Sequence, residues 1–143
     1  MSDGQDWIVA CVIATEVPPK STGGFSAVMI PVAIQAVSDV IRNRAASGKF
    51  PDTAVEVVLQ PKQFSAVCRE DYWRKAMAGK WFPAHVAKCL AIWQNPGPPV
   101  APGALYYYSP ISMVPPMSAP GWAAKLTEVP AAGLDRTYFR FYR

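Results

Sequence analysis

The residue best suited to acid–base chemistry is Glu16, which closes an apolar stretch of helical spacing and precedes Val17-Pro18-Pro19. A glycosidic bond breaks when a carboxylic acid protonates the leaving oxygen, and this acid serves near neutral pH when its surroundings favour the protonated form. Apolar neighbours and the negative end of a helix dipole both have that effect. Glu16 is therefore a candidate general acid; the alternative is an ordinary exposed residue at a helix end.

A run of tyrosines, Tyr106, Tyr107 and Tyr108, could form the wall of a sugar-binding site. Tyrosine combines an apolar ring face with a polar tip, which suits stacking on a sugar ring. Successive side chains of a strand point to opposite faces, so Tyr107 should point away from its two neighbours. We expect at least one of the three rings in the core, and we expect Tyr106 and Tyr108 to help line the groove.

Two polar segments could complete such a site. Gln63 and Ser65 flank Phe64 and could hydrogen-bond Glu16 or an N-acetyl group, or only satisfy their own turn. Asn43, near the end of the second predicted helix, could contact substrate or hydrogen-bond buried backbone and be structural. These residues are the candidate substrate-binding groups beside the tyrosines.

Cleavage by water needs a second carboxylate about 5–9.5 Å from the first. Asp39 is the best candidate, because it lies beside the buried stripe of the second predicted helix, but no motif surrounds it. A reaction with one carboxylate is the other option. In that reaction Glu16 protonates the leaving oxygen and then removes the C6 hydroxyl proton, so that the sugar closes on itself.

Composition limits the other classes of function. A length of 143 residues suits one domain, 1–143, and 51% apolar with 17% charged residues excludes a disordered chain. The net charge of +4 forms no Lys/Arg block, so nucleic-acid binding is not expected, whereas anionic wall polymers are plausible partners. Fifteen prolines, clustered at 96–102 and 110–120, predict irregular loops in the second half.

The cysteines and the histidine argue against metal and thiol chemistry. Cys11, Cys68 and Cys89 are widely spaced and odd in number, and His85 is the single histidine of the chain. This pattern lacks the short-spaced ligands of a zinc site and weakens any Ser-His-Asp or Cys-His mechanism. We therefore expect no metal and no cofactor.

Apolar periodicity, proline stops and capping residues predict the elements that position these groups. No segment approaches 18 apolar residues, and the N-terminal residues lack a basic region, so neither a membrane span nor a signal peptide is expected. We predict helices over about 5–16, 30–46, 51–59, 72–78 and 83–93, and aromatic strands over 104–108 and 137–142 that could pair as a small sheet.

Several short motifs follow one another along the chain: Arg42-Asn43-Arg44, Phe50-Pro51-Asp52-Thr53, Val57-Val58, Gln60-Pro61-Lys62-Gln63-Phe64-Ser65-Ala66-Val67, Gly103-Ala104-Leu105-Tyr106-Tyr107-Tyr108-Ser109-Pro110 and Phe139-Arg140-Phe141-Tyr142. In this order they resemble the SleB-type cell wall hydrolases, typified by spore-cortex-lytic enzymes. The resemblance implies an α+β, mainly helical, lysozyme-like domain (similar to goose lysozyme and soluble lytic transglycosylases) with a small antiparallel sheet. It also implies cleavage of peptidoglycan between N-acetylmuramic acid and N-acetylglucosamine with anhydromuramyl products.

By this resemblance Glu16 takes the place of the family's catalytic glutamate, and Ser65 that of its hydroxyl residue. The chain departs from the family at Val17-Pro18-Pro19-Lys20, where relatives have Ala-Arg-Gly-Glu, and at Phe139, where relatives often have a histidine. The prediction is a peptidoglycan lytic transglycosylase. The alternatives are a hydrolysing muramidase or a non-catalytic glycan-binding virion protein. We expect a protein encoded by a phage. It would be made in the host cytoplasm and would act on the cell wall in the periplasm, either as part of a virion or together with a holin.

Overall fold

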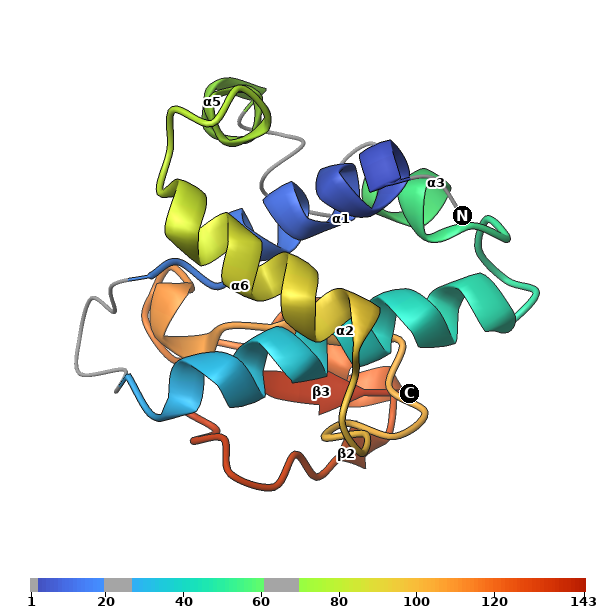
Figure 1. Ribbon diagram of the computed structural model, residues 1–143. Coiled ribbons are helices and arrows are strands. Elements are labelled where there is room, and N and C mark those ends of the chain that lie inside the picture. Colours follow the sequence, from blue (N-terminus) through green and yellow to red (C-terminus); the bar gives the residue numbers. More distant parts are fainter. Residues whose placement is uncertain (1–2, 20–26, 61–69) are drawn as a thin grey trace.

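The computed structural model describes residues 3–19, 27–60 and 70–143, which form a helical part followed by a small sheet (Figure 1). The mainly helical α+β class is as predicted. The helices are α1 (Asp3–Glu16), α2 (Met29–Ala46), α3 (Ala54–Val58), α5 (Glu70–Met77) and α6 (Pro83–Gln94); the strands are β1 (Tyr106–Tyr108), β2 (Glu128–Val129) and β3 (Arg140–Tyr142); two 3-10 helices are η1 (Pro110–Ser112) and η2 (Gly121–Lys125).

Helix α1 is the central element of the helical part, and α2, α3, α5 and α6 all contact it. Each residue from Val9 to Ala14 is at most 1% exposed. The helical spacing of apolar residues in this segment predicts one apolar face, but the middle of α1 is buried on all sides because it has neighbouring helices on several sides. Its last residue, Glu16, emerges from this core.

The helix ends follow the local signals in the sequence. After Glu16, Pro18 and Pro19 have no N–H to continue the hydrogen-bond ladder of α1. Thr53 caps α3: the Glu56 N–H donates to Thr53 Oγ1 at 3.2 Å, and this hydroxyl donates to Glu56 Oε1 at 2.8 Å. The Thr53 hydroxyl thus satisfies one free N–H group in the first turn of α3 and is itself held by the carboxylate of the same glutamate.

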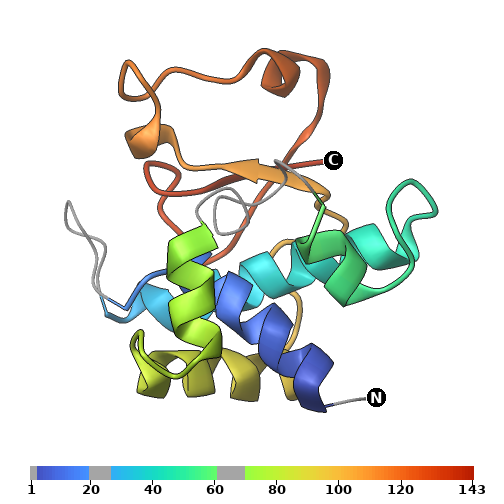
Figure 2. The same cartoon turned by 90° about the horizontal axis from the view of Figure 1, so that it is seen from above.

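The sheet has the order β1-β3-β2 and is antiparallel throughout. Tyr107 pairs with Phe141 in β3, and Val129 of β2 pairs with the same Phe141 from the other side. The predicted pairing of the two aromatic segments is confirmed. Strand β2 was not predicted, because two residues ended by Pro130 carry no readable alternation. Figure 2 shows the chain from β1 to the C-terminus lying to one side of the helices.

A polar stripe on α2 holds the proline-rich linker that leads into β1. Asp39 Oδ2 accepts hydrogen bonds from the backbone N–H groups of Val100 (2.6 Å) and Ala101 (3.0 Å), and its Oδ1 accepts one from Gln35 Nε2 (2.9 Å). Asn43 Nδ2 donates to the carbonyl of Ala104 at 2.9 Å. The linker is thereby fixed against α2, and this fixes where β1 begins.

Replacing Asp39 by alanine should lower the free energy of unfolding by about 3 kcal/mol, since it leaves the Val100 and Ala101 N–H groups without their acceptor. Urea denaturation measures this change. Asp52→Ala, at an exposed position, is the matched control and should stay within about 0.5 kcal/mol of the wild type. Equal losses in the two variants would contradict the role given to Asp39.

Candidate active site

Glu16 lies where the helices meet the sheet, and Tyr107 of β1 binds its carboxyl group. The Tyr107 hydroxyl donates to Glu16 Oε1 at 2.5 Å, across 91 residues of sequence. The Tyr107 ring packs on Phe139 and Phe141, with ring centroids 6.0 and 5.7 Å apart. The contact orients the partly buried Glu16 side chain from a rigid aromatic support.

Tyr107 is a permanent hydrogen-bond donor. Burial raises its pKa well above the ordinary value, and the charge of Glu16 and the hydrogen bond to it act in the same direction. The phenol therefore stays protonated at neutral pH. The sequence predicts apolar neighbours for Glu16 and polar contacts from Gln63 or Ser65. It did not indicate that the Tyr107 hydroxyl contacts the carboxyl group.

Arg44 of α2 places a buried positive charge near this pair. Its side chain is 4% exposed, its Nε donates to the Leu105 carbonyl at 2.6 Å, and its guanidinium lies 4.7 Å from the Phe50 ring centroid. Burial lowers the pKa of Arg44, while Tyr107, Tyr106 and Glu16 oppose that shift electrostatically. Arginine stays charged in proteins, so Arg44 can stabilise the carboxylate that remains when Glu16 gives up a proton.

The other two tyrosines of β1 point to the opposite face of the sheet, as the alternation predicts. There Tyr106 and Tyr108 contact Trp122 of η2, with ring centroids 5.7 and 5.9 Å apart, and Tyr108 stacks on Tyr142. Tyr108 is only 8% exposed, so it serves as a core residue of this second aromatic cluster. Tyr107, which was expected to point away from Tyr106 and Tyr108, is thus the tyrosine that contacts Glu16.

The remaining predicted site residues have different outcomes. Asn43 uses its amide nitrogen on the carbonyls of Ala101 (3.4 Å) and Ala104 (2.9 Å), which is the structural role left open by the sequence. Gln63, Phe64 and Ser65 lie outside the described residues, and their roles stay predictions. Tyr106 is partly buried, and sugar stacking on it also stays a prediction.

Sequence reasoning missed the polar stripe of α2 and the ring of Trp122. Gln35, Asp39 and Asn43 are four residues apart, a spacing that places polar side chains on one side of a helix. That spacing was the available signal for the stripe. Trp122 gave no such signal, because a lone aromatic in a proline-rich segment has no periodicity to indicate its partner.

Cys89 and His85 stand one turn apart on α6, but they do not form a nucleophilic pair. Burial raises the pKa of both Cys11 and Cys89 to about 12, so each stays a neutral thiol. The Nε2 atom of His85 lies 2.6 Å from the Val17 carbonyl and 3.8 Å from Cys89 Sγ. Across residues 3–19, 27–60 and 70–143, no three His, Cys, Asp or Glu side chains group as metal ligands.

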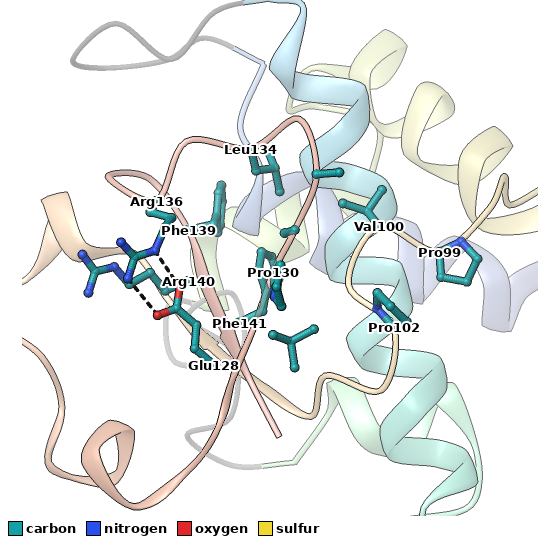
Figure 3. A pocket seen from close by; sticks show the side chains of 13 residues that line it. Pro99, Val100, Pro102, Glu128, Pro130, Leu134, Arg136, Phe139, Arg140 and Phe141 are labelled. Atoms are coloured by element: carbon teal, nitrogen blue, oxygen red, sulfur yellow. Dashed lines mark hydrogen bonds and ion pairs between the residues drawn. The ribbon is translucent and has the colours of Figure 1, made fainter.

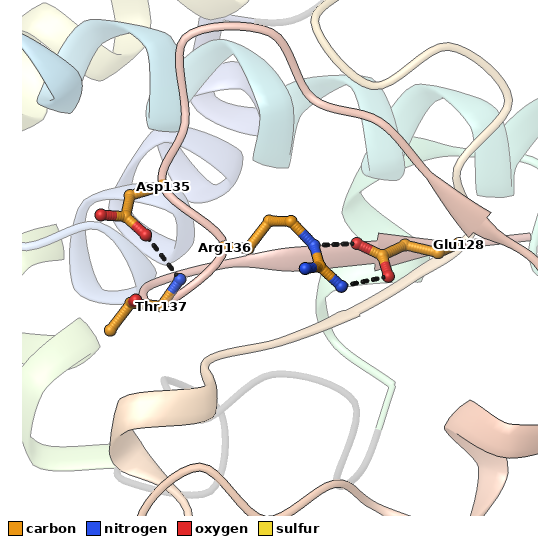
Figure 4. A network of polar contacts seen from close by, with 4 residues as sticks. All are labelled: Glu128, Asp135, Arg136 and Thr137. Atoms are coloured by element: carbon orange, nitrogen blue, oxygen red, sulfur yellow. Dashed lines mark hydrogen bonds and ion pairs between the residues drawn. The ribbon is translucent and has the colours of Figure 1, made fainter.

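A pocket of about 470 Å³ opens between the 99–102 linker and the segment from β2 to β3 (Figure 3). Proline, valine and phenylalanine side chains line most of it, and Glu128 and Arg136 form a bidentate ion pair there at 2.7 and 2.8 Å (Figure 4). Phe139 and Phe141 line the pocket and also contact the Tyr107 ring. Glu16 is not among the lining residues, so this pocket is distinct from the acid's surroundings.

The described residues thus form a mainly helical domain with a carboxyl group at the end of a buried helix, beside a short antiparallel sheet. Residues 32–139 match the family described as Cell Wall Hydrolase, so the chain belongs to the cell wall hydrolase family. The predicted class, an enzyme that degrades the peptidoglycan of the cell wall, is confirmed by this membership. The matched segment includes Tyr107 and begins after Glu16, so it leaves the role of Glu16 a prediction.

A solved structure has the same fold: the catalytic domain of the germination-specific lytic transglycosylase SleB from Bacillus anthracis. Its TM-score is 0.65 at 20% sequence identity, over 100% of this chain and 97% of that one. The resemblance to SleB-type enzymes and the lysozyme-like fold are thereby confirmed. No curated protein matches the chain. Within the described part of the chain, every helix is too short or too polar to cross a membrane.

Proposed function

We propose that this protein is a lytic transglycosylase that cleaves peptidoglycan between N-acetylmuramic acid and N-acetylglucosamine, with Glu16 as general acid and base. The supporting observation is the contact of Tyr107 with Glu16 at the junction of helices and sheet. The similar SleB catalytic domain bears the name of a lytic transglycosylase, which fits the same reaction.

In the proposed reaction Glu16 first donates its proton to the glycosidic oxygen, and the bond from that oxygen to C1 of the muramic acid breaks. Its carboxylate, near the Arg44 cation, then takes the proton of the C6 hydroxyl as that oxygen attacks C1. The products are a 1,6-anhydromuramyl end and a free N-acetylglucosamine hydroxyl. Glu16 ends the cycle protonated again, and no water is consumed.

A single catalytic carboxylate is favoured by the contacts of two other acidic residues, Asp39 and Glu128. Asp39, the candidate second carboxylate, is 6% exposed and accepts hydrogen bonds from Gln35, Val100 and Ala101. Glu128 is paired with Arg136, which lowers the pKa of this glutamate, chiefly through their hydrogen bonds. Both groups have structural partners, which weakens the hydrolysing muramidase with Asp39.

Digestion of purified sacculi distinguishes the two reactions. We expect muropeptides one water lighter than those with reducing ends, because the sugar supplies its own nucleophile. Mass spectrometry before and after borohydride treatment measures this, since anhydro ends are not reduced. A digest made of reducible ends would overturn the transglycosylase and favour hydrolysis by water.

A further inference from the structure

The residue that follows Glu16 is held at both of its backbone polar groups. The Val17 N–H donates to the Ile13 carbonyl at 2.9 Å and so extends the hydrogen bonding of α1 by one residue. The Val17 carbonyl lies 2.6 Å from Nε2 of His85, which stands in the first turn of α6. Val17 itself is fully buried.

This second contact satisfies a carbonyl group that α1 cannot satisfy itself. The last carbonyls of an α-helix have no partner within the helix, and Pro18 and Pro19 bring no N–H groups to the end of α1. A buried carbonyl without a donor is unfavourable. His85 supplies that donor from 68 residues away in the sequence.

The chemistry of the contact fixes the state of the imidazole. A carbonyl oxygen only accepts, so Nε2 must carry the proton that it donates. His85 is 7% exposed, and burial lowers its pKa, so the ring stays neutral at neutral pH. It is held in place by α6, which packs along α1 (Figure 1).

We infer that His85 is a positioning residue for Glu16, and this inference rests on the proposed function. By holding the Val17 carbonyl, His85 fixes where the chain leaves α1, and with it the backbone that carries the acid. Tyr107 holds the carboxyl group from the sheet side, and His85 holds the adjacent backbone from the helical side. A displacement of about 1 Å at a reacting group can cost about 100-fold in rate.

Two amide variants of similar polarity test this inference, because only one reaches the carbonyl. In His85→Gln the amide nitrogen falls near the position of Nε2, whereas the shorter side chain of His85→Asn does not extend so far. We expect kcat on soluble glycan strands to fall about 10- to 100-fold in His85→Asn with KM within about 2-fold. In His85→Gln we expect kcat within about 3-fold of the wild type.

Cys89→Ala is the matched control for packing, since Cys89 is buried on the next turn of α6 beside His85. It should keep kcat within about 3-fold. The inference is overturned if both amide variants keep wild-type kcat, if both lose it equally, or if Cys89→Ala loses as much as His85→Asn. Full activity of Glu16→Gln would refute the proposed function instead, and this variant is measured in the same assay.

Discussion

Glu16→Gln is expected to abolish wall-degrading activity, with a rate at least about 1,000-fold below the wild type, and to leave the fold unchanged. Glutamine keeps the shape of glutamate, and its carbonyl oxygen can still accept the hydrogen bond from Tyr107. Its amide group has no acidic proton to deliver to the glycosidic oxygen. Clearing of a turbid suspension of purified cell wall measures the rate, and thermal unfolding measured by circular dichroism checks the fold.

Glu56→Gln is the matched control, because Glu56 is an exposed glutamate of α3 whose side chain accepts a hydrogen bond from the Thr53 hydroxyl. It should clear cell wall at the wild-type rate. If Glu16→Gln clears cell wall as fast as Glu56→Gln does, another residue is the acid. If Glu16→Gln is inactive and also unfolds at a lower temperature, misfolding could explain the lost activity. Glu16→Asp then separates misfolding from loss of the acid, since aspartate keeps a carboxyl group on a shorter side chain.

The helices were predictable from the sequence because their signals are local. Pro18 and Pro19 end α1, and Thr53 caps α3 through residues three positions apart. Strand alternation also predicted that Tyr107 points opposite to Tyr106 and Tyr108. Each of these inferences needs only neighbouring residues, and local rules of backbone geometry were sufficient for them.

The partners of these residues were not predictable, because they are far apart in the sequence. Tyr107 and Glu16 are 91 residues apart, and His85 and Val17 are 68 apart. Periodicity identified which face of an element is buried but not which side chain lies across from it. The sequence likewise did not indicate that Trp122 and Tyr142 pack on Tyr108, and a sugar wall that includes Tyr106 and Tyr108 stays a prediction.

Asp39 shows the same limit for a polar group. Its position beside a buried stripe suggested a second catalytic carboxylate. The same position also suits a carboxylate that accepts hydrogen bonds from the backbone N–H groups of a neighbouring segment. The linker that supplies the N–H groups at Val100 and Ala101 is 61 and 62 residues away. An acidic residue in an apolar setting thus indicates that it has a hydrogen-bond partner, and only the fold identifies that partner.

Tyr107→Phe is expected to lower kcat about 10- to 100-fold while the unfolding temperature changes little. A hydrogen bond to a charged group contributes about 1.5–3 kcal/mol, which corresponds to that range of rates. Phenylalanine keeps the ring that packs on Phe139 and Phe141, so the loss reports on the hydroxyl alone. Tyr108→Phe, on the opposite face of β1, is the control and should stay within about 3-fold.

The pH dependence of this variant separates a fixed donor from a titrating one. The donor is the neutral phenol, which is lost only as pH rises through the pKa of Tyr107, and burial places that pKa well above the ordinary value of about 10. The ratio of wild-type to Tyr107→Phe rates should therefore not decline as pH rises from about 7 to 9. A ratio that falls toward unity as pH rises within that range would mean that the phenol ionises there and is not the permanent donor that its burial requires.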